Sequence, residues 1–287
     1  MTTPAEVIHG TSALLKNVLQ RDLRLEIEVL LAHVLQVTRS QLLARLQDPI
    51  DELPLREFDE LLARLIQHEP LAYIIGYREF YGIEITCWDD ALIPRPETEM
   101  LVDLALEEIT RRGDDLRIID VGTGAGAVAI AIAENAPQVR IIATDASAAA
   151  LDVATKNVRA YGVGSRVMLR PGDLLASTGE FDLILANLPY VSEGEWQTLE
   201  PEIQEYEPRS ALVGGVHGTE IIERLIAEAP QHLAEGGVLA AEIGETQGER
   251  LLTVARRFFP DGYAYVMKDY AGKDRVLVIR REEEGIG

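Results

Sequence analysis

The sequence contains little that would suggest a secreted, membrane or metal-binding protein. Cys87 is the only cysteine in 287 residues, which excludes an intrachain disulfide and favours a reducing compartment. Residues 1–10 lack the apolar core of a signal peptide, and the longest apolar run, 125–133, is far below the roughly 20 residues of a membrane helix. The five histidines have no metal-ligand spacing. We therefore expect a cytoplasmic protein without a membrane segment or a bound metal.

Basic residues are also scarce, with 27 Lys and Arg against 48 Asp and Glu and a formal net charge of −21. Both halves of the chain are acidic. Affinity for nucleic acid depends largely on basic side chains that neutralise phosphates, so we expect no direct nucleic-acid partner. An acidic surface would instead suit a basic protein surface. Hydrophobic residues make up 47%, which is typical of a folded chain, and the length allows two domains.

Residues 1–77 predict a helical N-terminal domain. The segment Thr3–Glu6 has the pattern of a capping box with proline at the first helical position. Apolar residues then recur at helical spacing. Ser40 is expected to cap a short helix, and Pro70 to begin a last helix that Gly76 ends. Without a glycine loop or metal-ligand spacing, this domain is interpreted as a bundle for docking or stability.

Residues 78–97 predict a β-hairpin linker between two domains. Apolar and polar residues alternate through Phe80–Trp88, as in a half-buried strand. Two aspartates at 89–90 favour a turn. The segment Ala91–Arg95 is expected to form the return strand, which the prolines at 94 and 96 would end.

Residues 98–287 alternate between strand and helix patterns. Buried strands are expected at 116–121, 139–144, 167–170, 181–186 and 237–243, and a final strand pair at 263–268 and 276–280. Alternating units of this kind predict an α/β, Rossmann-like fold with a mostly parallel, doubly wound sheet. Ligands of such sheets bind beyond the carboxyl ends of the strands.

A glycine loop follows the first of these strands. After Asp120 and Val121 come Gly122, Thr123, Gly124, Ala125 and Gly126. Glycines permit a tight turn and a close approach of a ligand, and the spacing also fits a dinucleotide-binding loop. Asp120 favours S-adenosyl-L-methionine, because a carboxylate suits an ammonium and a sulfonium better than a pyrophosphate. Asp145 suits ribose hydroxyls in either cofactor class, and Asp173 the adenine amino group.

The fourth strand leads into Asn187-Leu188-Pro189-Tyr190. This tetrapeptide resembles the Asn-Pro-Pro-Tyr motif of amino-methyltransferases, which act on NH2 groups attached to planar, conjugated carbons. An amide nitrogen is a poor nucleophile and needs acceptors for both N–H bonds. The side-chain oxygen of Asn187 and the backbone carbonyl of Leu188 can supply them, while Tyr190 offers a face for the planar amide. We therefore predict Asn187, Pro189 and Tyr190 as catalytic, and all four residues as substrate-binding.

Leu188 departs from the motif, in which proline is usual at this position. We expect the change to be tolerated, because the required group is a carbonyl and Pro189 keeps Leu188 extended. The tetrapeptide also resembles that of ribosomal RNA adenine dimethyltransferases. An adenine N6-methyltransferase acting on RNA or DNA is therefore an alternative, as is a non-catalytic protein that only binds the cofactor.

Longer segments resemble the release factor glutamine methyltransferase family. They are spread over most of the length of the chain: Pro70–Gly76, Arg78–Gly82, Ile93–Glu99, Tyr206–Leu212, Glu242–Gly244, and the residues Asp269, Gly272, Asp274, Arg275 and Val276. The resemblance implies a substrate-recognition domain at the N-terminus and a seven-stranded catalytic domain. It also implies N5-methylation of the glutamine in the Gly-Gly-Gln motif of class I peptide chain release factors. The donor would be S-adenosyl-L-methionine, which leaves S-adenosyl-L-homocysteine, and the methylation would modulate translation termination. Separately from the resemblance, we expect the protein to be a monomer.

The resemblance also assigns residues by position. The loop Gly122–Gly126, Asp145, Leu174 and Asn187 match cofactor contacts. Leu174 stands where an aromatic residue is frequent in the family, so stacking on adenine would be weaker. Three further residues match family motifs and have either a direct role or one in structural ion pairs: Arg95, Glu207 and Glu242.

Overall fold

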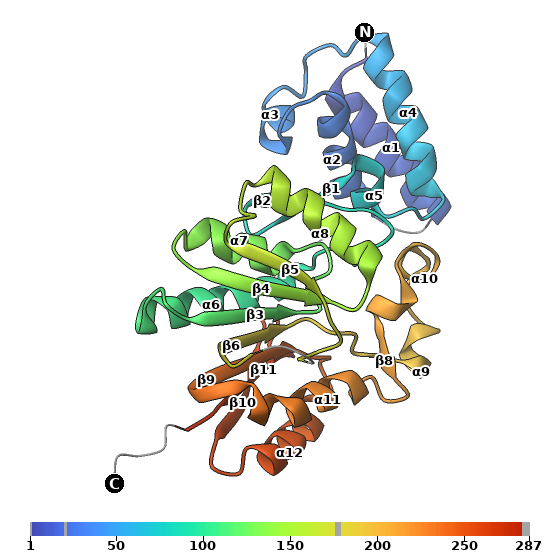
Figure 1. The fold of residues 1–287 in the computed structure, drawn as a ribbon. Helices are drawn as coiled ribbons and strands as arrows, with labels where there is room; N and C mark the ends of the chain where they lie inside the picture. The colour runs from blue at the N-terminus through green and yellow to red at the C-terminus, as the bar shows by residue number, and fades with distance from the viewer. Residues whose placement is uncertain (1, 20–21, 176–178, 283–287) are drawn as a thin grey trace. The chain divides into compact units, whose positions relative to one another are not determined.

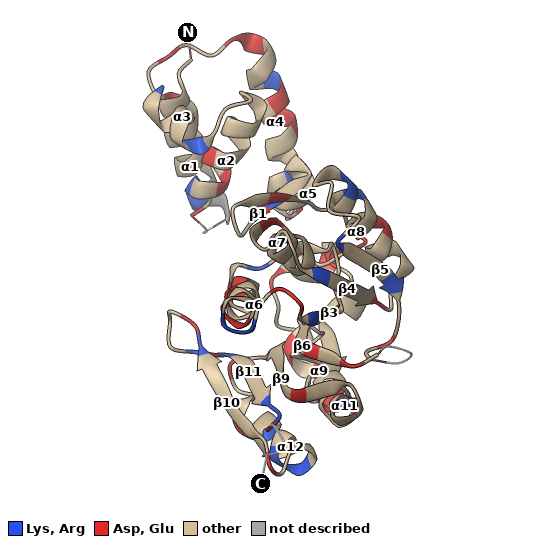
Figure 2. Ribbon diagram, turned by 60° about the vertical axis from the view of Figure 1, so that its left-hand side comes forward, with Lys and Arg blue, Asp and Glu red and all other residues tan. Residues whose placement is uncertain are grey.

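The computed structural model describes residues 2–19, 22–175 and 179–282 of the chain (Figure 1). Backbone contacts divide the chain into two compact units, Met1–Gly76 and Tyr77–Gly287. Acidic residues lie on elements of both units (Figure 2). Within the three described ranges, no helix is long and apolar enough to cross a membrane.

The first unit is helical, as predicted. Its helices are α1 Pro4–Leu19, α2 Arg24–Val34, α3 Arg39–Ala44, α4 Glu52–Ile66 and α5 Leu71–Ile75. The expected capping box begins α1: Oγ1 of Thr3 accepts from the N–H of Glu6 at 3.3 Å, and Oε2 of Glu6 accepts from the N–H of Thr3 at 3.0 Å. Leu30, Leu31 and Phe58 are buried in the core of the bundle. The apolar spacing of the sequence therefore marks the faces that pack together.

The cap of α3 differs from the prediction. Thr38, not Ser40, caps the helix, and its Oγ1 accepts from the N–H of Gln41 at 3.1 Å. The side chain of Gln41 in turn accepts from the N–H of Thr38 at 3.0 Å. Thr38 takes the position because Gln41 stands three residues after it and completes a capping box. Pro70 and Gly76 flank α5 as predicted, with a φ of 86° at Gly76.

The hairpin forms earlier in the chain than predicted. Strand β1 Tyr77–Phe80 pairs antiparallel with β2 Ile83–Thr86. The turn lies at Tyr81 and Gly82, whose φ angles of 50° and 75° suit a tight two-residue connection. The predicted return strand at 91–95 is wrong. The N–H of Ile93 in that segment donates to the side chain of Glu207 at 3.2 Å and is therefore not available to a strand partner.

The second unit is built on a seven-stranded sheet in the order β10-β11-β9-β6-β3-β4-β5 (Figure 1). Strands β5, β4, β3, β6 and β9 are parallel, and β11 and β10 are antiparallel to their neighbours. The strands are β3 Arg117–Val121, β4 Arg140–Asp145, β5 Val167–Pro171, β6 Phe181–Ala186, β9 Leu233–Glu242, β10 Tyr263–Lys268 and β11 Asp274–Arg280. The predicted doubly wound α/β fold is confirmed.

Helices cover both faces of this sheet. The principal helices of the unit are α6 Glu99–Arg112, α7 Ala127–Asn135, α8 Ala148–Ala160, α11 Glu220–Glu228 and α12 Gly248–Phe258. Successive strand residues point to opposite faces: Ile118 packs in the core with α6 to α8, and Ile119 in the core with α11 and α12. A near-continuous apolar run is the pattern expected of a strand that is buried on both faces.

The chain changes direction at β3. It first builds β4 and β5 outward on one side of β3, and then returns to place β6 on the other side. The carboxyl ends of β3 and β6 therefore lie side by side at the switch point, where ligands of open α/β sheets bind. Shorter elements follow β6: β7 Val191–Ser192, α9 Glu193–Trp196, α10 Pro201–Tyr206 and β8 Val213–Gly215.

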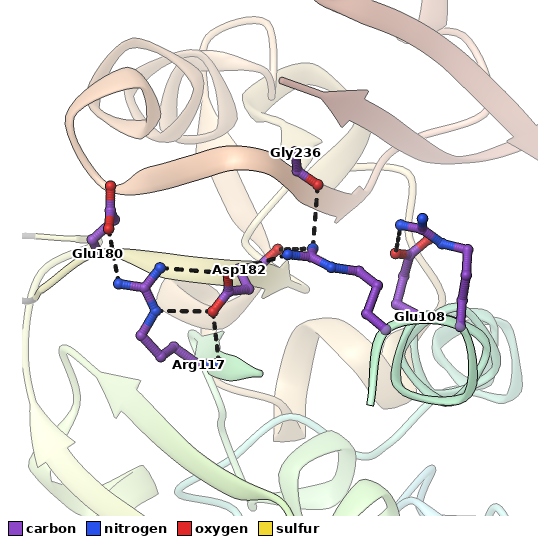
Figure 3. Close-up of polar contacts among 7 residues, drawn as sticks. Glu108, Arg117, Glu180, Asp182 and Gly236 are labelled. Atoms are coloured by element: carbon purple, nitrogen blue, oxygen red, sulfur yellow. Dashed lines mark hydrogen bonds and ion pairs between the residues drawn. The ribbon is translucent and has the colours of Figure 1, made fainter. Parts of the chain in front are cut away.

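Charged side chains join β3 to β6 at the opposite, amino edge of the sheet (Figure 3). Arg117, which begins β3, donates to Asp182 at 2.9 Å and to Glu180 at 2.8 Å. Asp182 also accepts from Arg112 at 3.2 Å, and the same guanidinium donates to the carbonyl of Gly236 at 3.2 Å. These contacts fix the two central strands at one edge, while their other ends carry the glycine loop and the Asn187–Tyr190 loop.

Candidate active site

The glycine loop at the end of β3 is held by the neighbouring strand β4. The N–H groups of Gly122 and Thr123 both donate to the carbonyl of Thr144, at 2.8 and 2.9 Å. The glycines at 122, 124 and 126 have φ angles of 73°, 55° and 85°, which disfavour other residue types. Gly126 is also the N-cap of α7. The loop therefore exposes backbone at the N-terminus of a helix.

The glycine loop contacts the Asn187–Tyr190 loop directly. A Cβ atom at Gly122 would lie 2.7 Å from Cδ2 of Leu188 and 3.4 Å from the backbone oxygen of Asn187. Leu188 is buried, so its side chain cannot easily move away. Gly122 is therefore needed both for its backbone conformation and for the close approach of the second loop.

Asp120 is a buried carboxylate beneath the glycine loop. Its Oδ2 accepts a hydrogen bond from the hydroxyl of Thr123 at 2.6 Å. Burial raises the pKa of Asp120 to about 6, against the hydrogen bond from Thr123, which lowers it. No cationic side chain among the described residues pairs with Asp120. A buried carboxylate of this kind that lines a cavity is suited to a cationic group of a ligand.

Asp145 ends β4 and links two loops. Its Oδ2 accepts from the N–H of Gly124 and its Oδ1 from the N–H of Ser147, both at 2.8 Å. Burial raises the pKa of Asp145, and these backbone hydrogen bonds lower it. Each carboxylate oxygen has lone-pair capacity beyond the bond that it already accepts. Asp145 can therefore hold the glycine loop and still accept from hydroxyl groups in the cavity.

Asp173 and Leu174 follow β5 at the mouth of the same cavity. Oδ2 of Asp173 accepts from Arg224 at 2.7 Å, in an ion pair that is more than half exposed. Leu174 is buried and has a φ of 51°, an uncommon value for leucine. Its left-handed backbone turns the chain sharply at the point where an aromatic residue is frequent in the family that it resembles.

The side chain of Asn187 is part of a hydrogen-bonded chain. Its Nδ2 donates to Oγ1 of Thr98 at 2.9 Å, and the Thr98 hydroxyl donates to Oε2 of Glu242 at 2.6 Å. The hydroxyl of Tyr190 donates to Oε1 of Glu242 at 3.0 Å. Among the described residues, no donor contacts Oδ1 of Asn187. That oxygen is the free acceptor of a residue that lines the cavity.

One cavity of about 430 Å³ collects most of the predicted site residues. This volume lies in the range of small-molecule sites. The lining includes Gly122, Thr123, Gly124, Ala125, Asp145, Asp173, Leu174, Asn187, Leu188 and Pro189. Gly126 and Tyr190 are not among its lining residues: Gly126 faces Ile130 and Ala154, and Tyr190 reaches Glu242. In the described part of the chain, no three His, Cys, Asp or Glu side chains form a cluster that could hold a metal ion.

The chain is similar to known proteins over most of its length. It is 36% identical over 261 residues to a release factor glutamine methyltransferase of Bacillus cereus, covering 89% of this chain and 92% of the relative. It is 37% identical over 293 residues to the enzyme of that name in Nitratidesulfovibrio vulgaris, covering 97% and 98%. The chain belongs to the release factor glutamine methyltransferase family.

Two family models agree with this assignment, and a solved structure shares the fold of the second unit. Residues 6–76 match the PrmC N-terminal domain and residues 98–203 the methyltransferase small domain. A methyltransferase structure from Pyrococcus furiosus is similar with a TM-score of 0.50 and 20% identity, covering 78% of this chain and 99% of that one. The structural likeness concerns the fold alone. The predicted seven-stranded methyltransferase fold is confirmed, and the chain is a methyltransferase.

Several cavity residues of this methyltransferase were not predicted from the sequence. They come from segments before α6, at the start of α8, between α10 and β8, and in α11: Phe80, Asp90, Ala91, Leu92, Pro94, Thr98, Ser147, Ala150, Pro208, Ser210, Ala211, Ile221 and Arg224. A signal for some of them was present, because Ile93–Glu99 and Tyr206–Leu212 resemble the family. Resemblance alone did not show that these segments form walls of the cavity.

Arg95 and Glu207 form an ion pair that connects two of these walls. The guanidinium of Arg95 donates to Oε1 of Glu207, and Oε2 accepts from the N–H of Ile93. The side chain of Glu207 is 2% exposed and that of Arg95 is 30% exposed. Neither residue lines the cavity. Their contacts are those of a pair that fixes the 91–95 segment against the end of α10.

Proposed function

We propose that this methyltransferase uses S-adenosyl-L-methionine as its methyl donor. When bound, the donor supplies an electrophilic methyl group on a sulfonium. The residues of the cavity fit it: Asp120 is a carboxylate for a cationic group, Asp145 an acceptor for hydroxyls, and Gly122–Ala125 a backbone surface that a ligand can approach closely. Asp173, Leu174 and Asn187 complete the proposed contacts.

We further propose that the methyl acceptor is the side-chain amide N5 of the glutamine in the Gly-Gly-Gln motif of class I peptide chain release factors. The observation that carries this proposal is the orientation of Asn187, whose Nδ2 is engaged by Thr98 and whose Oδ1 remains an acceptor. Relatives at 36% and 37% identity are named for glutamine methylation of release factors. A methylated factor would act in translation termination, in the cytoplasm.

The chemistry requires the lone pair of an amide nitrogen to become available. In the proposed complex, Oδ1 of Asn187 accepts one N–H of the substrate amide and the carbonyl of Leu188 the other. Both acceptors stabilise the positive charge that grows on nitrogen during transfer. Pro189 shapes the loop, and Tyr190, fixed by Glu242, offers its ring to the planar amide. Holding the two reactants in line supplies much of the remaining rate enhancement.

The first unit is proposed to recognise the release factor rather than to take part in the chemistry. It has its own core, and the proposed chemistry uses residues of the second unit alone. The strong negative charge of the chain suits a basic surface on the factor. Replacing acidic residues of this unit with neutral ones is expected to raise KM for the factor. The same changes should not alter kcat on a short peptide that carries the Gly-Gly-Gln motif.

The proposed function is tested by methyl transfer in a defined mixture. The full chain is incubated with methyl-labelled S-adenosyl-L-methionine and a recombinant release factor, beside a factor whose motif glutamine is replaced. We expect label on the intact factor and none on the altered one. Asn187→Ala should abolish transfer. Asn135→Ala, which removes an amide that donates to the carbonyl of Ala131 in α7, should retain it.

The outcomes separate the competing functions. Label on RNA or DNA in place of the factor would overturn the proposal in favour of an adenine methyltransferase. Binding of the donor without transfer to any of these acceptors would favour a protein that only binds the cofactor. Mass spectrometry of the labelled peptide would place the added methyl group on the glutamine side chain if the proposal is correct.

A further inference from the structure

A row of buried, hydrogen-bonded side chains lies next to the side chain of Asn187. Thr98 ends the short helix η1 Pro96–Thr98, before α6, and Glu242 ends strand β9, next to β6. Thr98 is 4% exposed and Glu242 1% exposed. Residues far apart in the sequence thus meet beneath the loop that carries Asn187 and Tyr190. Burying a carboxylate is costly unless hydrogen bonds compensate it, so this arrangement needs a physical reason.

The hydrogen bonds around Glu242 account for its burial. Oε2 accepts from Thr98 at 2.6 Å and Oε1 from Tyr190 at 3.0 Å. Burial raises the pKa of Glu242, while these two hydrogen bonds and the positive charge of Arg275 act to lower it. A carboxylate with two donors aimed at its two oxygens is satisfied only as an acceptor.

The direction of these hydrogen bonds follows from the carboxylate of Glu242, which is the acceptor. A hydroxyl has one hydrogen, and Thr98 donates it to Glu242. Toward Asn187 the Thr98 oxygen can therefore offer only a lone pair, which must meet the NH2 end of the amide. If the amide were rotated by half a turn, Oδ1 would face a second oxygen without a hydrogen between them. The two ends of a side-chain amide are distinguished by such partners and by little else.

We propose that Thr98 and Glu242 are positioning residues, which fix the side-chain amide of Asn187 so that Oδ1 faces the methyl acceptor. This inference rests on the proposed role of Asn187 and deepens it. The carboxylate sets the direction of the Thr98 hydroxyl, and the hydroxyl sets the orientation of the amide. The site is thereby selective for an acceptor group that carries N–H donors, such as a glutamine amide, over a group that presents only oxygens.

The central test replaces the hydroxyl of Thr98 and keeps its shape. Thr98→Val removes the acceptor for Nδ2, so the amide of Asn187 is free to rotate. We expect kcat for methylation of the release factor to fall about 10- to 100-fold, as for other small misplacements of a reacting partner. KM for the factor and the dissociation constant of S-adenosyl-L-methionine should change little, since most of both binding surfaces is untouched. Thr98→Ser, which keeps a hydroxyl, should restore most of kcat.

Two controls address folding and general effects. Thr110→Val makes the same substitution in α6, where the hydroxyl donates to the carbonyl of Leu106, and should keep wild-type kcat. Circular dichroism and the midpoint of thermal unfolding show whether each variant is folded at the assay temperature. If Thr98→Val does not fold, the decision rests on Glu242→Gln and on Thr98→Ser, which test the same chain.

Glu242→Gln tests whether the carboxylate of Glu242 sets the direction of the Thr98 hydroxyl. The glutamine has nearly the same shape but can donate to Oγ1 of Thr98, which then turns its hydrogen toward Asn187. We expect a fall in kcat with little change in KM. Glu108→Gln is the matched control. Glu108, which Figure 3 labels, is also a buried glutamate. It pairs with Arg111 and Arg280 outside the cavity, so its change should leave kcat unaltered.

The results distinguish this inference from the proposed function. Absence of methyl transfer by the wild-type enzyme would overturn the proposed function itself. Wild-type transfer together with an unchanged kcat in Thr98→Val or in Glu242→Gln would overturn the positioning role alone. Equal impairment of Thr98→Ser and Thr98→Val would also overturn it, because the hydroxyl would then not be the group that matters.

Discussion

The carboxylate of Asp120 lies 2.6 Å from the hydroxyl of Thr123, buried below the loop that Thr123 itself forms. Burial raises the pKa of Asp120 to about 6. Above that pH the free enzyme carries a buried negative charge in a cavity wall. A cationic ligand would compensate the charge, and its binding would keep Asp120 ionised at lower pH.

The affinity for S-adenosyl-L-methionine is therefore expected to depend on pH. Below about pH 6 the free enzyme is protonated at Asp120, and binding must release that proton, so affinity should fall up to about tenfold per pH unit. Isothermal titration calorimetry between pH 5 and pH 8, in buffers of different ionisation enthalpy, measures both the affinity and the number of protons released on binding. Asp120→Asn should bind S-adenosyl-L-methionine weakly at every pH. If the affinity of this variant fell with pH as steeply as that of the wild type, Asp120 would not be the group that releases the proton.

The raised pKa also has a consequence for the stability of the free enzyme. The folded chain binds a proton at Asp120 that the unfolded chain lacks between its ordinary pKa of 3.8 and about 6. The unfolding free energy should therefore decrease as pH rises through this window, as far as this group is concerned. Comparing denaturant unfolding of the wild type and Asp120→Asn at several pH values isolates the contribution, which should be absent in the variant.

Gly214 of strand β8 supports the Asn187–Tyr190 loop by close backbone contact. A Cβ atom there would lie 2.2 Å from the carbonyl oxygen of Pro189 and 2.5 Å from that of Gly218. Gly214→Ala should displace Pro189 and lower kcat about 10- to 100-fold, while binding of the methyl donor at the glycine loop is retained. Steady-state kinetics and calorimetry separate the two effects. In Gly164→Ala a new Cβ would lie 3.7 Å from Val158, an ordinary contact, so this control should be active.

The sequence predicts the parts of this structure that depend on local pattern. Strands β6 and β10 have the predicted bounds, because buried or alternating apolar runs end in polar turns. The glycine loop is recognisable because its residues are adjacent in the chain. The seven-residue segment that resembles a family motif at Ile93–Glu99 is also visible, although its place in the cavity wall is not.

Features that depend on distant partners could not be predicted. The segment 91–95 has an apolar pattern compatible with a strand, yet the N–H of Ile93 bonds Glu207, 114 residues later. Thr98 lies in the segment that resembles the family, but its proposed role emerges only from its contacts with Asn187 and Glu242, 89 and 144 residues away. Such contacts depend on the topology of the sheet, which brings the ends of β6 and β9 together.

Asn157 in α8 ties the hairpin to the glycine loop and should be important for stability. Its side chain accepts from the N–H of Thr86 at 3.0 Å and donates to the carbonyls of Thr86 and Ala125 at 3.1 and 2.9 Å. The residue is 1% exposed, so Asn157→Ala leaves backbone groups unsatisfied and should lower the unfolding free energy by about 2–4 kcal/mol. Urea unfolding measures this loss. A change below about 1 kcal/mol would mean that water replaces the side chain.

The ion pair of Arg95 and Glu207 should act on stability rather than on chemistry. Glu207 is almost fully buried and Arg95 partly exposed, so the two single substitutions are not equivalent. Arg95→Met leaves an unpaired buried carboxylate and should cost about 2–4 kcal/mol, whereas the guanidinium left by Glu207→Gln can turn toward water and should cost less. The double variant should recover part of the loss, which thermal and urea unfolding of all four proteins would show as coupling.

At temperatures where each variant is folded, kcat should stay close to the wild-type value, because neither residue lines the cavity. A large fall in kcat for a fully folded Arg95→Met would instead give the guanidinium a direct part in methyl transfer.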